Sequence, residues 1–160
     1  MSKFTEHYYV SWDEIQDRCV QMARHLKSEG HQFERILAIT RGGLFPAGII
    51  ARELGIHHVE TICIKTYGGK GEQSVGEPVL LKAADPEYLK DTLIIDDLVD
   101  TGTTLKFIKP MTENCYFLAV FAKPQGEPML DLYHMTIEQD KWVMFPWDTR
   151  RQYVDPVSAA

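Results

Sequence analysis

Hydrophobic residues recur at helical spacing near the start of the chain. They are Ile15, Cys19, Met22, Ala23 and Leu26. Because residues three or four positions apart share one face of a helix, this spacing predicts an amphipathic helix. Ser11 followed by Glu14 is a capping-box pattern, so we expect the helix to begin just after Ser11 and to end at Gly30.

Beyond this helix, short apolar runs alternate with further helical patterns. The apolar runs cover residues 35–40, 59–65, 79–81, 93–97 and 116–122, and the helical patterns cover residues 46–54 and 105–111. Strands that alternate with helices form parallel sheets, because a crossover must carry the chain back between neighbouring strands. We therefore predict an α/β fold with a central, mostly parallel sheet flanked by helices.

Two segments break this alternation. Residues at about 66–79 are rich in glycine and polar side chains, which favours a mobile flap over a packed element. Residues at about 126–150 have an irregular pattern, and we expect them to form a small C-terminal hood over the sheet. A chain of 160 residues can bury one core, so we expect a single domain over residues 1–160.

Composition narrows the class of protein. A formal net charge of -6 argues against nucleic acid as a partner. Cys19, Cys63 and Cys115 are odd in number and far apart, which predicts neither a disulfide framework nor a structural zinc site. No apolar stretch is long enough to cross a bilayer. We expect a cytoplasmic protein without integral membrane association, and peripheral attachment to the inner membrane stays open.

The run of residues 93–104 carries most of the candidate chemistry. An apolar strand pattern leads into Asp96 and Asp97, and Asp100 and the loop Thr101-Gly102-Thr103-Thr104 follow. Adjacent strand residues point to opposite faces, so the first two acids suit a sugar diol and a hydrated cation. Backbone amides and hydroxyls at the start of a helix suit a phosphate. The alternative is that the acids are solvated turn residues and the threonines a helix cap.

This run resembles the motif that binds phosphoribosyl pyrophosphate (PRPP) in the type I phosphoribosyltransferases. Further segments match that family in the same order, and within it the bacterial enzymes for xanthine and guanine: Trp12-Asp13, Arg41-Gly42-Gly43-Leu44, residues 51–56, Ala122-Lys123-Pro124 and Pro146-Trp147-Asp148. The resemblance covers most of the chain, and the order and spacing of these segments make it more specific than any one of them.

The resemblance implies an activity in purine salvage. PRPP and a 6-oxopurine (guanine, xanthine or hypoxanthine) would give a nucleoside 5′-monophosphate (GMP, XMP or IMP) and pyrophosphate, with Mg²⁺ as the cofactor. It also implies the type I phosphoribosyltransferase fold and a homo-oligomer, either a dimer or a tetramer.

The resemblance also assigns the residues that would hold PRPP. Asp97 would lie closest to the metal, Asp96 would act through the ribose or water, and Asp148 would hold a second hydrated Mg²⁺. The loop Thr101, Gly102, Thr103 and Thr104 would bind the 5′-phosphate.

The turn at Arg41 and Gly42 resembles the pyrophosphate loop of the family, which often contains a non-proline cis peptide. Glycine permits close backbone approach and arginine offers a bidentate fork. The alternative is a plain turn with a surface charge. The flap arginine of the relatives is missing here. Lys70 is the one cation between residues 67 and 78, and as a point charge it would be a weaker substitute.

Four residues are expected to read the purine. By resemblance, Asp100 would bond N7 and act as the general acid/base, and Lys123 would bond the 6-oxo oxygen. Trp142 offers a ring for stacking, and the backbone carbonyl of Val143 suits an exocyclic 2-amino group. The alternatives are a helix cap for Asp100, a solvated Lys123 and core packing for Trp142.

Two other functions stay open at this stage. One is a hypoxanthine-guanine phosphoribosyltransferase, which differs in how the 2-position of the purine is read. The other is a regulator that senses PRPP without turnover and binds nucleic acid through another surface. The acidic composition and the absence of a clustered basic segment in the sequence count against the regulator.

Overall fold

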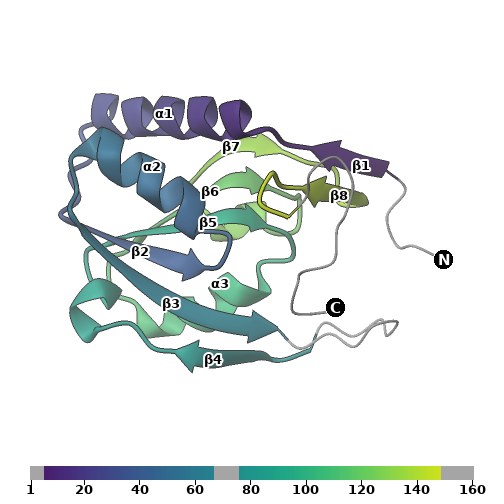
Figure 1. Ribbon diagram of the computed structural model, residues 1–160. Coiled ribbons are helices and arrows are strands. Elements are labelled where there is room, and N and C mark those ends of the chain that lie inside the picture. Colours follow the sequence, from purple (N-terminus) through teal and green to yellow (C-terminus); the bar gives the residue numbers. More distant parts are fainter. Residues whose placement is uncertain (1–5, 67–75, 149–160) are drawn as a thin grey trace.

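A six-stranded sheet forms the centre of the protein (Figure 1). The computed structural model describes residues 6–66 and 76–148. The strand order is β4-β3-β2-β5-β6-β7. The strands are β2 (Arg35–Thr40), β3 (His58–Thr66), β4 (Pro78–Lys82), β5 (Leu93–Val99), β6 (Tyr116–Ala122) and β7 (Leu132–Thr136). All neighbours are parallel except β3 and β4, so the predicted fold class is confirmed.

Helices cover both faces of this sheet (Figure 1). They are α1 (Trp12–Ser28), α2 (Leu44–Leu54) and α3 (Thr103–Ile108), with short 3-10 turns at Pro86–Leu89, Lys109–Met111 and Glu127–Met129. In β5, Leu93 and Ile95 pack in one buried cluster with residues of α1 and α2, whereas Ile94 packs in a second cluster with residues of α3. A strand that is buried on both faces has a continuous run of apolar residues, and this run is why the sequence predicted β5.

The first helix forms where its pattern predicts. The hydroxyl of Ser11 accepts a hydrogen bond from the amide of Glu14 at 3.0 Å, and α1 begins one residue after Ser11. The expected apolar positions are its buried ones. The second helix begins at Leu44, two residues before the expected start, and ends at Leu54, where Gly55 caps it with a left-handed φ of 69°.

The segment expected to form a hood divides into two parts. Residues 132–136 form β7, which pairs with β6 at the edge of the main sheet. Residues 141–144 form β8 (Lys141–Met144), which pairs in parallel with β1 (Glu6–Tyr9) in a separate two-stranded sheet. The expectation that residues 132–136 belong to a hood over the sheet is therefore corrected, because these residues form an edge strand of the sheet itself. Strand β1 was not expected, because its mostly exposed, polar sequence has no apolar run.

The strand order creates a place for a ligand. The chain moves outward from β2 to β3 on one side and from β5 to β6 and β7 on the other, so β2 and β5 are neighbours with connections that diverge. Crevices form outside the carboxyl ends of such strands.

Most of the expected flap lies outside the described residues, and its two ends, Thr66 and Pro78, are paired in the β3–β4 ladder. No helix in the described parts of the chain has the length and apolarity to cross a membrane.

Candidate active site

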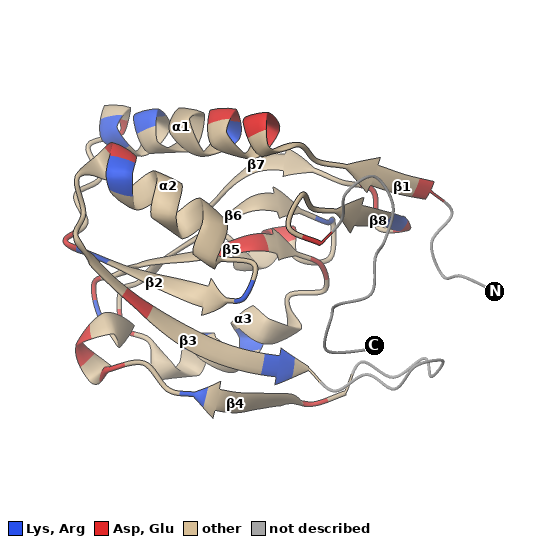
Figure 2. Ribbon diagram, in the orientation of Figure 1, with Lys and Arg blue, Asp and Glu red and all other residues tan. Residues whose placement is uncertain are grey.

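Two carboxylates occupy the carboxyl-terminal half of β5. The strand runs on to Val99, two residues beyond the expected end at residue 97, and Asp96 and Asp97 lie within it as the sequence predicted. The amide of Asp97 donates to Oδ1 of Asp96 at 2.9 Å, and the amide of Leu98 donates to Oδ1 of Asp97 at 2.7 Å. These local hydrogen bonds orient both carboxylates. Figure 2 shows that the acidic part of β5 lies beside the turn that follows β2.

The electrostatics of this pair favour a cation. Burial raises the pKa of Asp96 well above its ordinary value, and the charge of Asp97 raises it further. Burial also raises the pKa of Asp97, to which the charge of Asp148 adds. Among the described residues neither Asp96 nor Asp97 forms a salt bridge. Burial and mutual repulsion therefore disfavour the charged forms of these carboxylates, and a bound cation would offset both effects.

The loop after β5 has the shape expected of an anion site. Gly102 has a left-handed φ of 76° and precedes α3, whose first amides have no partner within the helix. The hydroxyls of Thr101 and Thr103 lie 2.8 Å apart. A cavity of about 320 Å³ is bordered by Asp96, Asp100 and the four loop residues Thr101, Gly102, Thr103 and Thr104. The loop thus brings amides, hydroxyls and carboxylates to one cavity.

The turn after β2 packs directly against Asp97. A cis peptide bond joins Thr40 and Arg41, as the resemblance implied for many members of the family. A Cβ atom placed on Gly42 would lie 2.0 Å from Oδ2 of Asp97, so only glycine lets the backbone approach this closely. The side chain of Arg41 is exposed at this edge.

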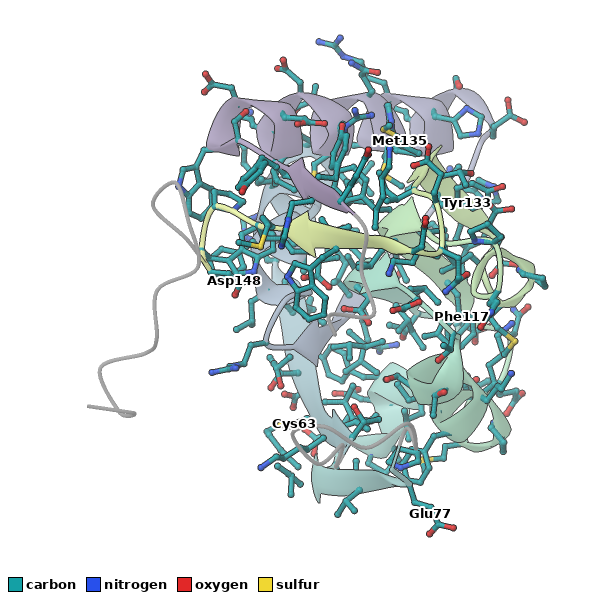
Figure 3. The ribbon with its side chains drawn as sticks, turned by 90° about the vertical axis from the view of Figure 1, so that its right-hand side faces the viewer. Cys63, Glu77, Phe117, Tyr133, Met135 and Asp148 are labelled. Carbon is teal, nitrogen blue, oxygen red and sulfur yellow. The ribbon has the colours of Figure 1, made fainter. Side chains whose placement is uncertain are left out.

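Asp148 lies near the same turn. It follows β8 on the side of the molecule seen in Figure 3. Burial raises the pKa of Asp148, and the charge of Arg41 lowers it. Arg41, Asp97 and Asp148 are therefore within electrostatic reach of one another, although they are far apart in the sequence.

A buried lysine is hydrogen-bonded to Asp100. Lys123 is 1% exposed and follows β6. Its Nζ atom donates to Oδ2 of Asp100 at 3.2 Å and to the backbone carbonyl of Gln139 at 3.4 Å. The solvated alternative for Lys123 is wrong, because a fully buried ammonium needs such acceptors.

Asp100 has a second donor that the sequence did not reveal. The side-chain amide of Gln139 donates to Oδ1 of Asp100 at 2.5 Å, and Gln139 Oε1 accepts from the amide of Gln125 at 3.1 Å. Gln139 lies between β7 and β8 in a polar turn without any motif, so no local signal marked it.

Strand β8 presents the two remaining candidates. Trp142 is 44% exposed, so the core alternative for it does not hold. Val143 is buried and pairs with Tyr8 of β1. The carbonyl of Met144 accepts from the amide of Val10, and backbone groups alternate between the two edges of a strand. The carbonyl of Val143 is therefore directed to the edge away from β1.

The structure brings the expected residues to one edge of the sheet in two groups. Asp96, Asp97, Arg41 and Gly42 lie around the ends of β2 and β5, and Asp100, which borders the cavity with Asp96, is hydrogen-bonded to Lys123. Within residues 6–66 and 76–148, no cluster of three or more histidine, cysteine or acidic side chains has the geometry of a metal cage. Lys70 lies outside the described residues.

Comparisons with known proteins agree with this geometry. A family model described as "Phosphoribosyl transferase domain" matches residues 11–153. The xanthine-guanine phosphoribosyltransferase of Desulfotalea psychrophila is 41% identical, and the alignment covers 97% of this chain and 94% of that protein. The enzyme of the same name from Ruegeria sp. is 42% identical over 93% of this chain and 89% of its own length.

A solved structure has the same architecture. The crystal structure of the purine phosphoribosyltransferase from Pyrococcus horikoshii superposes with a TM-score of 0.74 at 26% identity, covering 93% of this chain and 99% of that one.

Proposed function

This chain belongs to the phosphoribosyltransferase family, and from that premise we propose that it transfers the phosphoribosyl group of PRPP to a 6-oxopurine. The products are a nucleoside 5′-monophosphate and pyrophosphate, and the reaction is one of purine salvage. The regulator without turnover is the less favoured reading, since the relatives at about 41% identity are named as enzymes.

One observation carries this proposal. The anion loop Thr101 to Thr104 and Asp100 border one cavity, and the buried Lys123 is paired with Asp100 behind it. A phosphate held by the loop and a purine held by the pair would therefore face one another across the space that a ribose fills. This arrangement supports transfer between the two and explains why both groups of residues lie at one edge of the sheet.

The reaction requires that one bond replaces another at C1′ of the ribose. The bond from C1′ to the pyrophosphate oxygen breaks with its electron pair on oxygen, and a bond from C1′ to N9 of the purine forms. The purine loses one proton, and Asp100 accepts it from N7. Asp100 can do so because the side chain is 46% exposed toward the cavity while its two oxygens are oriented by Lys123 and Gln139.

Asp96 and Asp97 fit a magnesium site shared with the substrate. Mg²⁺ prefers oxygen ligands and is commonly held by one or two carboxylates together with oxygens of the substrate. The Asp96–Asp97 pair suits this mode of binding, because no third acidic side chain among the described residues completes a metal cage around it. When bound, the ion would neutralise charge on the departing pyrophosphate. The protein would contribute the two carboxylates, with Asp97 closest to the metal, and Asp148 would hold a second hydrated ion. Arg41 and the amides of the turn at Gly42 would orient the pyrophosphate.

Base recognition follows from donors and acceptors. The Lys123 ammonium can only donate, so it suits the 6-oxo oxygen of guanine, xanthine and hypoxanthine and opposes the 6-amino group of adenine. The Val143 carbonyl suits the 2-amino group of guanine, and Trp142 offers its exposed ring to the purine face.

Pyrophosphate release from PRPP tests the function directly. The assay uses guanine, xanthine, hypoxanthine or adenine, each with and without Mg²⁺. We expect turnover with the three 6-oxopurines, little with adenine, and dependence on the metal. The absence of release with all four purines at millimolar Mg²⁺ and PRPP would refute the proposal. Turnover of hypoxanthine and guanine without xanthine would identify the hypoxanthine-guanine activity instead.

We further propose a homo-oligomer, either a dimer or a tetramer. Trp12 and Leu44 are 52% and 44% exposed, and Trp12 lies beside the stacked rings of Phe45 and Trp147. An exposed apolar group of this kind is typical of a surface that a second subunit covers. Light scattering during gel filtration measures the assembly. The cytoplasmic location stays a prediction.

A further inference from the structure

Gln139 contacts both side chains that are expected to read the purine. Its Nε2 atom donates to Oδ1 of Asp100 at 2.5 Å, and its backbone carbonyl accepts from Nζ of Lys123 at 3.4 Å. These three residues come from three different segments, after β5, after β6 and between β7 and β8. A single turn residue thus links two groups that the chain brings together only in the folded state.

The orientation of the Gln139 amide is fixed by a backbone group. Gln139 Oε1 accepts from the amide of Gln125 at 3.1 Å, and a backbone N–H can only donate. The other end of the side chain must therefore be the NH₂ group, and this group faces Asp100. The hydrogen-bond network itself removes the usual ambiguity between the oxygen and nitrogen of a glutamine.

We propose that Gln139 is a positioning residue for base recognition, an inference that rests on the proposed function. Gln139 holds Oδ1 of Asp100 and so fixes the plane of the carboxylate, and Oδ2, which already accepts from Lys123, is then oriented to accept the N7 proton of the purine through its second lone pair. Its backbone carbonyl holds Lys123 in place for the 6-oxo oxygen. Without the side-chain amide, Asp100 keeps Lys123 as a donor but loses the contact that fixes its plane, because one hydrogen bond does not define the rotation of a carboxylate.

Two substitutions separate the donor from the volume of the side chain. In Gln139→Met the methionine side chain has a length similar to that of glutamine but carries no hydrogen-bond donor. Gln139→Glu keeps an acceptor for the Gln125 amide and turns an acceptor toward Asp100. Gln32→Met is the matched control, since Gln32 is exposed in a loop outside the cavity. Melting temperatures of all variants report on folding.

The measurement compares two inhibitors that differ at position 7. 9-Deazaguanine carries an N7–H that can donate to Asp100, and 7-deazaguanine has a carbon there. Inhibition constants against guanine are measured for each variant, together with KM for guanine and for PRPP. We expect Gln139→Met to raise the inhibition constant of 9-deazaguanine about tenfold, the loss typical of one hydrogen bond to a charged group. Its effect on 7-deazaguanine and on KM for PRPP should stay below about twofold, and Gln139→Glu should cause the larger loss.

Two results would overturn the inference. Equal weakening of both inhibitors would indicate general damage to the site, and unchanged constants in both Gln139 variants would show that the contact has no role. Failure of the proposed function is a separate outcome, because it would appear in the unmodified protein as absence of pyrophosphate release.

Discussion

The substitution Gly42→Ala probes the packing of the turn after β2 against Asp97. The added methyl group would lie 2.0 Å from Oδ2, 2.3 Å from Cγ and 2.6 Å from Oδ1 of Asp97. Real Cβ atoms essentially never lie within 3.0 Å of such neighbours, so the carboxylate or the turn must retreat by at least about 1 Å. All three atoms of the carboxyl group are affected, and rotation alone does not relieve the contact.

The cost of that retreat can be worked out from the contacts of Asp97. Its Oδ1 accepts from the Leu98 amide at 2.7 Å, and a shift of about 1 Å would lengthen this distance beyond hydrogen-bonding range. Overpacking of this kind costs about 1–3 kcal/mol. Misplacement of a substrate-positioning group by about 1 Å can cost about a hundredfold in rate.

We expect Gly42→Ala to lower kcat/KM for PRPP about a hundredfold and to raise the Mg²⁺ concentration needed for half-maximal activity. KM for guanine should change less than about threefold, because the groups proposed to read the base do not contact Gly42. The assay is pyrophosphate release with PRPP, Mg²⁺ and guanine varied in turn. A stably folded Gly42→Ala enzyme with normal dependence on PRPP and Mg²⁺ would refute the reasoning.

Two other glycines serve as controls. A Cβ on Gly43 would lie 2.5 Å from the backbone carbonyls of Ile39 and Ile95, which cannot move independently of the sheet, so Gly43→Ala should lower the melting temperature. A Cβ on Gly48, inside α2, meets nothing within 4 Å. Gly48→Ala should leave activity unchanged and stabilise the helix by up to about 1 kcal/mol.

Three further substitutions test other parts of the site. Asp96→Asn should abolish most turnover yet raise the melting temperature, by about 2–4 °C for each kcal/mol of relieved repulsion. Because folding raises the pKa of Asp96, the stability due to its protonated form is present at acid pH and lost as pH rises, so thermal scans from about pH 4 to pH 8 should show the advantage of the variant growing. Trp142→Ala should raise KM for guanine about tenfold and KM for PRPP little, whereas steady-state kinetics with equal effects would indicate structural damage. Asp100→Ala should lower kcat about a hundredfold or more, and near-normal single-turnover rates would exclude a role in proton transfer.

Local patterns in the sequence were sufficient to predict the helices and strands that lead to the site. Strands β2 and β6 have the predicted bounds, and α1 begins at its predicted cap. These features depend on residues within a few positions of one another, such as the buried apolar run of a central strand or the hydroxyl of Ser11 and the amide of Glu14. The run from Asp96 to Thr104 is local in the same sense, and the resemblance to the family was therefore visible before any folding was considered.

Contacts between distant segments were decided only by the tertiary structure. The side chain of Gln139 reaches Asp100 across 39 positions, β1 pairs with β8 from the opposite end of the chain, and β7 joins the main sheet. The physical reason is that hydrophobic periodicity specifies which face of an element is buried but not which neighbour covers it. That choice depends on how the two faces of the sheet pack as a whole, and it is the packing that turns a polar glutamine in an ordinary turn into the partner of a buried lysine and its carboxylate.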